Sequence, residues 1–210
     1  MKRFLLILIV IIITSSMVLV GVGCTTTAAQ TTVIEFIGSD FELSLPEKWE
    51  GGRKDELDPI IENLKEMGQD QLAEQVEASL STFLFWGYDT ETAASSGNVS
   101  TFNITGDSSA AFLSLDEYMD LSYKNVAEAY EKAGYTFNII EEDVVPIGNY
   151  EEVGRTIFEQ TVESVETKWA QYIIKNGSDF WVLTFTAVVE QFDQGMQAFD
   201  KTIETFKIIE

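Results

Sequence analysis

An apolar run at the N-terminus constrains this chain most, because it removes the first residues from any globular core. Lys2 and Arg3 form a short positive start, and residues 4–20 are almost entirely apolar. Small residues occupy positions 21–23, directly before Cys24. This order of charge, apolar run and small residues is typical of an export signal. We therefore predict that residues 1–23 are a signal peptide or membrane anchor and that the rest of the chain faces outside the cytoplasm.

The end of this run resembles the lipobox of bacterial lipoproteins, in which a cysteine is acylated and the chain is cleaved directly before it. Gly23 and Cys24 match that pattern, whereas Gly21 stands where an aliphatic residue is expected. The alternative is an uncleaved anchor, since residues 4–23 are long enough as a helix to cross about 30 Å of hydrocarbon. The resemblance favours a lipid anchor on Cys24, followed by a polar tether at residues 24–32. The expected location is the cell membrane.

Cysteine, histidine and charge exclude several classes of function. Cys24 is the single cysteine, so no disulfide can form within the chain, and the absence of histidine excludes His-based catalytic triads and His-liganded zinc. Asp and Glu number 35 against 13 Lys and Arg, for a net charge of −22. Nucleic-acid binding needs basic residues that neutralise phosphates, so no nucleic-acid partner is expected. Anionic lipid headgroups would be repelled for the same reason.

Hydrophobic periodicity predicts strands and helices in a single globular domain over residues 33–210. Helical spacing begins after Asp58, breaks at Gly68 and resumes up to Leu80. The clearest helix covers 115–133, with a capping box of Ser114 and Glu117 at its start and Gly134 at its end. The expected strands cover 33–37, 41–45, 83–89, 99–105, 153–165, 169–175 and 180–187, and a last helix starts near 190. These elements predict an α+β fold in which helices pack on one antiparallel sheet.

The order of these elements resembles the PsbP-like domains, which share a fold with Mog1 and occur in many bacterial lipoproteins. Residues 41–49, Phe-Glu-Leu-Ser-Leu-Pro-Glu-Lys-Trp, are similar to the family's opening strand and its Pro-x-x-Trp ending. Residues 118–133 match its central helix and residues 148–154 its turn into a long hairpin. Residues 181–185, followed by Phe199, Ile203 and Phe206, look like its last strand and closing helix. The resemblance implies an α/β/α sandwich that serves as a binding or assembly module.

Catalytic and metal-binding motifs are not found in the sequence, so no catalytic residue, metal ligand or cofactor is predicted. The densest acidic clusters are residues 141–143 and residues 151–152, which are expected at exposed strand ends. The four tryptophans, Trp49, Trp86, Trp169 and Trp181, are expected in core or edge packing more than on a ligand platform. The leading hypothesis is a non-enzymatic lipoprotein that binds an extracellular protein or a small ligand. A calcium-binding or other cation-binding accessory protein is the alternative, and a carboxylate-based enzyme is third.

Overall fold

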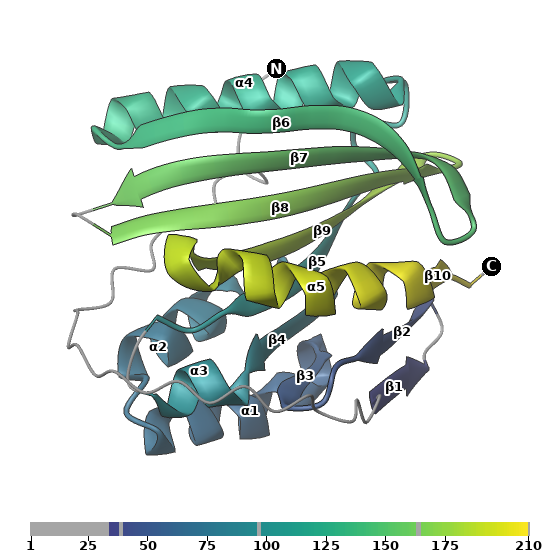
Figure 1. The fold of residues 1–210 in the computed structure, drawn as a ribbon. Coiled ribbons are helices and arrows are strands. Elements are labelled where there is room, and N and C mark those ends of the chain that lie inside the picture. Colours follow the sequence, from purple (N-terminus) through teal and green to yellow (C-terminus); the bar gives the residue numbers. More distant parts are fainter. Residues whose placement is uncertain (1–33, 38–39, 96–97, 163–164, 210) are drawn as a thin grey trace.

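The computed structural model describes residues 34–37, 40–95, 98–162 and 165–209, and it confirms an α+β fold built on a large antiparallel sheet (Figure 1). The strand order in that sheet is β3-β4-β5-β9-β8-β7-β6. Its strands are β3 Trp49–Arg53, β4 Phe85–Asp89, β5 Thr101–Asp107, β6 Thr136–Ile147, β7 Tyr150–Val162, β8 Val165–Asn176 and β9 Asp179–Val188. The predicted signal, the tether and the anchor residue Cys24 lie outside the described residues, so they stay predictions.

A small second sheet brings the two ends of the described chain together. It has the order β1-β2-β10, with β1 Ile34–Ile37, β2 Phe41–Leu45 and β10 Lys207–Ile208. β1 and β2, both expected as strands, pair antiparallel. The C-terminal strand β10 pairs with the other edge of β2, and the amide of Ile209 donates to the carbonyl of Asp40 at 3.0 Å.

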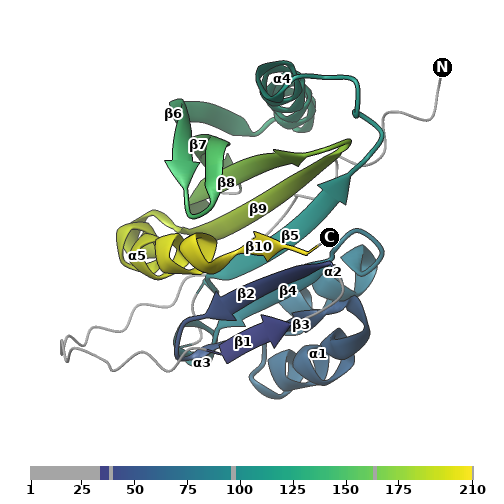
Figure 2. The ribbon, with the colours of Figure 1, turned by 90° about the vertical axis from the view of Figure 1, so that its right-hand side faces the viewer.

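The helices lie on both faces of the large sheet. α5 Val189–Thr205 covers one face, and α2 Asp70–Ser79 lies on the opposite side (Figure 2). α4 Leu115–Ala133 packs over β6, β7 and β8 on the same face as α2. α1 Leu57–Glu66 follows the short 3-10 helix Lys54–Glu56 (η2) and packs on α2 and β3, and α3 Thr90–Ala94 follows β4. The result is an antiparallel sheet between two helical layers.

One face of the central strands is mostly apolar, and we call it the core face. Its residues on β5, β9 and β8 are fully or almost fully buried: Phe102, Ile104, Leu183, Phe185, Ala170 and Tyr172. α5, the last helix expected from the sequence, places four apolar residues against them at helical spacing: Phe192, Met196, Phe199 and Ile203. The rings of Phe185 and Phe199 stack with their centroids 5.3 Å apart. Burial of aromatic surface on this scale makes the core face the main source of stability.

α4 and α5 are secured in different ways. In α4, the Ser114 hydroxyl accepts from the Glu117 amide at 3.2 Å, and the Glu117 carboxylate accepts from the Ser114 amide at 2.8 Å. Gly134 ends α4 with a positive φ of 79°, which glycine adopts without strain. This confirms the predicted capping box and stop. α5 has no side-chain cap at its N-cap residue Val188, so it is held by its packing.

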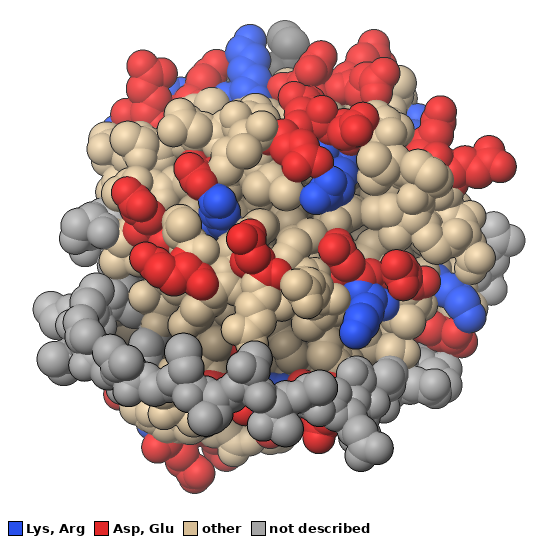
Figure 3. All heavy atoms as spheres, in the orientation of Figure 1, with Lys and Arg blue, Asp and Glu red and all other residues tan. Residues whose placement is uncertain are grey.

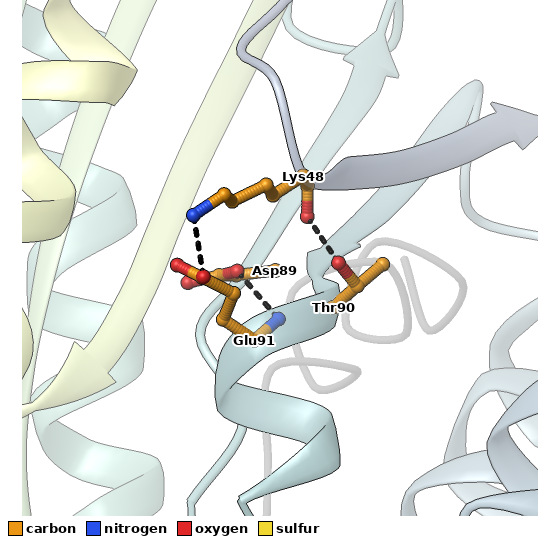
Figure 4. A network of polar contacts seen from close by, with 4 residues as sticks. All are labelled: Lys48, Asp89, Thr90 and Glu91. Carbon is orange, nitrogen blue, oxygen red and sulfur yellow. Dashed lines mark hydrogen bonds and ion pairs between the residues drawn. The ribbon is translucent and has the colours of Figure 1, made fainter. Parts of the chain in front are cut away.

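The turn between β2 and β3 is tied to α3 by a small polar network (Figure 4). Lys48 adopts a positive φ of 72°, which is unusual for a residue with a side chain. Its carbonyl accepts from both the amide and the hydroxyl of Thr90 at 2.8 Å, and its Nζ lies 2.5 Å from Glu91. Asp89 caps α3 by accepting from the Glu91 amide at 2.9 Å. The Pro-x-x-Trp sequence is therefore a turn that places Trp49 in the core.

The structure differs from the sequence expectations in several elements, and β3, α3 and β10 are among those that the sequence did not predict. The helix expected to start at Asp58 begins at Leu57, with Glu56 as N-cap, because the preceding 3-10 turn supplies its first turn. The strand β6 was not predicted, since most of its side chains are exposed and leave no clear alternation of buried and exposed positions. The acidic cluster 141–143, expected at a strand end, therefore lies in the middle of β6.

Candidate ligand-binding cleft

A cleft of about 470 Å³ opens between α2 and α4, on the sheet face opposite α5. The volume lies within the range of about 300–1,000 Å³ that small-molecule sites occupy. Its floor is formed by β5, β9 and β8, and its walls by α2, by the α2–β4 connection and by one side of α4. The cleft exists because α1 and α2 cover the β3–β4 end of the sheet while α4 covers the other end.

The floor of the cleft is polar, and we call this side of the sheet the cleft face. Strand register aligns Asn103, Thr184 and Gln171 in one cross-strand row. Thr101 and Thr186 align with Trp169 in the next row. The Gln171 amide donates to the Thr184 hydroxyl at 3.2 Å, which fixes the orientation of the Gln171 side chain. Uncharged hydroxyl and amide groups therefore stand where the core face carries aromatic and aliphatic side chains.

Two indole rings bound this polar floor. Trp86 on β4 pairs with Asn103, and its ring stacks on Tyr88 with centroids 5.6 Å apart. Trp169 on β8 donates its indole N–H to the Thr167 hydroxyl at 3.3 Å. β4 and β8 are three inter-strand spacings apart, about 14 Å. Both rings are held by neighbours, so they form fixed apolar ends for the floor.

The α4 wall contributes Tyr118, Ser122 and Val126, which share one side of the helix. Tyr118 stacks on Phe180 with centroids 3.9 Å apart and planes nearly parallel. Burial, and secondarily the charge of Asp107, raise the pKa of Tyr118 well above the usual range for a phenol. Tyr118 therefore remains protonated and uncharged at physiological pH. It presents a neutral hydroxyl near the cleft.

Charged residues line the cleft sparsely. Among the described residues that form it, Lys54 and Asp107 are the ones that carry a charge at neutral pH. They come from η2 and from the end of β5, away from the central row of the floor. The rest of the molecule differs sharply: acidic side chains are scattered over the face seen in Figure 3, with fewer basic ones among them, as a net charge of −22 requires. The cleft is therefore a nearly uncharged site in a strongly acidic protein.

The acidic clusters singled out in the sequence do not gather around the cleft. Glu141 pairs with Arg155 across β6 and β7 at 2.5 Å. The Asp143 carboxylate accepts the neighbouring Val144 amide at 2.8 Å, and Glu151 and Glu152 are exposed at the start of β7. Within the described ranges, no three acidic side chains converge in a way that could hold a metal ion. The structure thus gives these clusters local roles in β6 and its turn.

Exposed large apolar side chains lie near α4 and on β6 rather than in the cleft. They are Phe112, Leu121, Ile139, Ile140 and Val144. β6 is also an edge strand, which could in principle accept another strand. Three features work against that: the register break after Ile139, the Asp143 carboxylate on the Val144 amide, and Pro146, which has no N–H to donate.

The structure separates the four tryptophans into two pairs. Trp49 and Trp181 pack with the aromatic residues of the core face, as expected. Trp86 and Trp169 are also buried, yet both line the cleft. Sequence reasoning did not identify Asn103, Gln171 or Ser122 as site residues. The available signal was the alternation over 99–105, where threonine and asparagine interrupt phenylalanine and isoleucine on a strand that proves to be central.

Across the part of the chain that the structure describes, no helix is both long enough and apolar enough to cross a bilayer.

Comparisons with known proteins show what the fold resembles. No protein-family model matches the chain, and no curated protein matches it in sequence. The structure is similar to that of the cyanobacterial PsbP protein (CyanoP) from Synechocystis sp. PCC 6803, with a TM-score of 0.54 at 9% identity over 89% of this chain and 98% of that chain. It is also similar to LpqN of Mycobacterium tuberculosis, described as involved in cell envelope biogenesis, with a TM-score of 0.47 at 12% identity over 86% and 91%. The likeness to CyanoP confirms the expected PsbP-like fold, and at this identity it concerns the fold alone.

Proposed function

We propose that this chain is an exported, membrane-held binding module without catalytic activity, and that it binds a small ligand in the cleft between α2 and α4. The observation that carries the proposal is the polar floor on the central strands β5, β9 and β8. A face buried only for stability would carry apolar residues, as the core face does. A ligand that completes the hydrogen bonds of partly enclosed polar groups binds with a favourable free energy, because these groups have limited access to water.

The composition of the cleft supports binding rather than catalysis. Acid–base chemistry on a bound substrate needs two titratable groups in different environments. The described lining residues provide one carboxylate, Asp107, and the phenol of Tyr118, whose pKa is raised away from the neutral range. A nucleophile with an adjacent base is likewise missing from this lining, since its hydroxyl residues have no histidine beside them.

Membrane attachment is the second part of the proposal, and it rests on sequence. Lys2 and Arg3, the apolar run and Cys24 together support export and a lipid anchor. Mass spectrometry of the N-terminal peptide, from protein made in a bacterial host, tests this part. We expect a mature chain that begins at Cys24 and carries acyl groups. An intact Met1 terminus would instead show that residues 4–23 remain as an anchor helix.

The cleft is tested by filling it. Ser122 is buried on α4 and lines the cleft, so Ser122→Trp places an indole in the ligand space. Leu121→Trp is the matched control, because Leu121 is adjacent on α4 and 47% exposed. Ligand-observed NMR with a fragment library, on the full chain in lipid nanodiscs, should find fragments that bind the unmodified protein and Leu121→Trp but not Ser122→Trp. Fragments that bind all three proteins equally, or none of them, would contradict a ligand site in the cleft.

A further inference from the structure

The chemistry of the cleft also restricts what kind of ligand it takes, if the proposed function holds. Asn103 and Gln171 each carry an amide that can both donate and accept hydrogen bonds. They lie in the same cross-strand row, separated by Thr184. Because Gln171 is already oriented by its bond to Thr184, its amide is presented in a defined direction. The middle of the floor therefore matches a ligand group that is itself an amide or a hydroxyl.

The ends of the floor match apolar parts of a ligand. Trp86 and Trp169 are 3% and 5% exposed, and their rings are held by Tyr88 and by Thr167. Leu72 and Val76 on α2 and Val126 on α4 add apolar surface to the two walls. A ligand that reaches across about three strand spacings, roughly 14 Å, would bury apolar surface against these groups at each end.

A charged ligand would be poorly matched to this floor. Burying an ionised group without a partner costs far more free energy than burying an uncharged polar group. The central row contains no charged side chain, and Lys54 and Asp107 lie away from it. The net charge of −22 adds a long-range repulsion for anions.

We infer that the cleft binds an uncharged, elongated molecule with an apolar body and an amide or hydroxyl group near the Asn103–Thr184–Gln171 row. The inference rests on the proposed function and adds the chemical class of the ligand to it. Two features of the site give selectivity. The amides raise the affinity for a ligand that can form hydrogen bonds, and the lack of charge in the floor lowers the affinity for an ion.

Three probes with one apolar body test the inference: biphenyl-4-carboxamide, biphenyl-4-carboxylate and 4-(aminomethyl)biphenyl. Dissociation constants are measured by calorimetry on the full chain in lipid nanodiscs, with the Ser122→Trp protein as the control for partitioning into lipid. We expect the uncharged amide to bind at least about 10-fold more tightly than either ion. In Asn103→Leu and in Gln171→Leu, we expect amide affinity to fall at least about 5-fold. Asn138→Leu, the same change on exposed β6, should leave that affinity unchanged.

The outcomes separate this inference from the proposed function. If the amide and either ion bind equally well, and Ser122→Trp abolishes this binding, the ligand class is overturned but the cleft remains a site. If the carboxamide binds Asn103→Leu and Gln171→Leu as tightly as the unmodified protein, the role of the polar row is overturned. If no probe shows binding that Ser122→Trp abolishes, the cleft is overturned as a site for such molecules, and the fragment screen then decides whether it binds anything else.

Discussion

The two faces of β5, β9 and β8 are built from the same residue alternation, yet they meet different neighbours. On the core face, Phe102, Leu183 and Phe185 are covered by α5 and the small sheet, with no polar side chain between them. On the cleft face, Asn103 and Thr186 occupy the positions next to Phe102 and Phe185 and line the cleft. The same three strands therefore carry a packed apolar core on one side and the polar lining of a cleft on the other.

The helices over the two faces repeat this difference. α5 lacks a side-chain N-cap and is held by four buried apolar residues. α4 has caps at both ends, and its apolar contacts are spread over smaller clusters. α4 approaches β7 closely at Gly154, where an added Cβ would displace the Met119 side chain. We therefore expect α5 to respond to changes in packing and α4 to changes at its ends.

The largest expected effect is on the core face, where Phe185→Ala should lower the free energy of unfolding by about 3–5 kcal/mol. Phe185 is completely buried, and its ring contacts those of Trp49, Phe192 and Phe199. Urea unfolding followed by tryptophan fluorescence measures the change. A loss below about 1 kcal/mol would mean that the core face collapses readily around the missing ring, and the contrast with the cleft face would fail.

The contact between α5 and the core face is probed by Gly195→Ala. An added Cβ would lie 2.4 Å from Cζ of Phe185, so the ring or the helix must move. We expect a net loss of about 1–3 kcal/mol from this overpacking, although alanine favours a helix by about 1 kcal/mol over glycine. Thermal unfolding of Gly195→Ala beside Gln197→Ala, an exposed position on α5, measures it. A variant more stable than the parent chain would show that the interface between α5 and Phe185 accommodates the added methyl group without strain.

The ends of α4 are tested by Ser114→Ala, which removes the hydroxyl that accepts the Glu117 amide. We expect a loss of about 0.5–2 kcal/mol, typical of N-cap removal. Hydrogen exchange of the first turn of α4 should rise while exchange in α5 stays the same. If both helices exchange faster, α4 and α5 unfold together and are not secured independently.

A pH titration of Glu117 also tests whether the capping box stabilises the start of α4. The Ser114 amide, and secondarily the Ser114 hydroxyl, donate to the Glu117 carboxylate and hold the pKa of this carboxyl below its usual range. A lowered pKa in the folded state stabilises the fold above the ordinary value of the carboxyl, and this contribution is lost as the pH falls through the lowered value. The stability of the parent chain relative to Glu117→Gln should therefore decrease on acidification below about pH 4. A difference that does not change with pH would contradict a capping role for the charged carboxylate.

The smallest expected effect is at the cleft face, where Thr186→Val should change the free energy of unfolding by less than about 0.5 kcal/mol. Thr186 lies on β9 next to Phe185 but faces the cleft. Valine keeps its shape and its preference for strands. Urea unfolding beside Phe185→Ala gives the direct comparison between neighbours. A loss above about 1.5 kcal/mol would show that this hydroxyl is part of the structural framework.

Local signals were enough to predict much of the fold. The capping box at Ser114, the stop at Gly134 and the helix face of α5 were all readable, because each depends on residues close in the sequence. β6 was not, since an exposed edge strand leaves no regular burial pattern. The cleft was also hidden. The polar positions of 99–105 look like a solvent-facing edge until the topology places β5 in the middle of a sheet beside β9.

If the domain is held by its N-terminus, as proposed above, the pairing of β10 with β2 has a mechanical consequence. Tension along the chain would enter at β1 and pass into β2. β2 is hydrogen-bonded along one edge to β1 and along the other to β10, and we call this three-stranded arrangement the clasp. The Tyr150 hydroxyl accepts the Ile208 amide at 2.8 Å and adds a link from this clasp to the long hairpin of β6 and β7. The load would be shared between the two ends of the domain on the core-face side. The cleft floor, on the reverse of the sheet, would keep its shape while the domain is pulled.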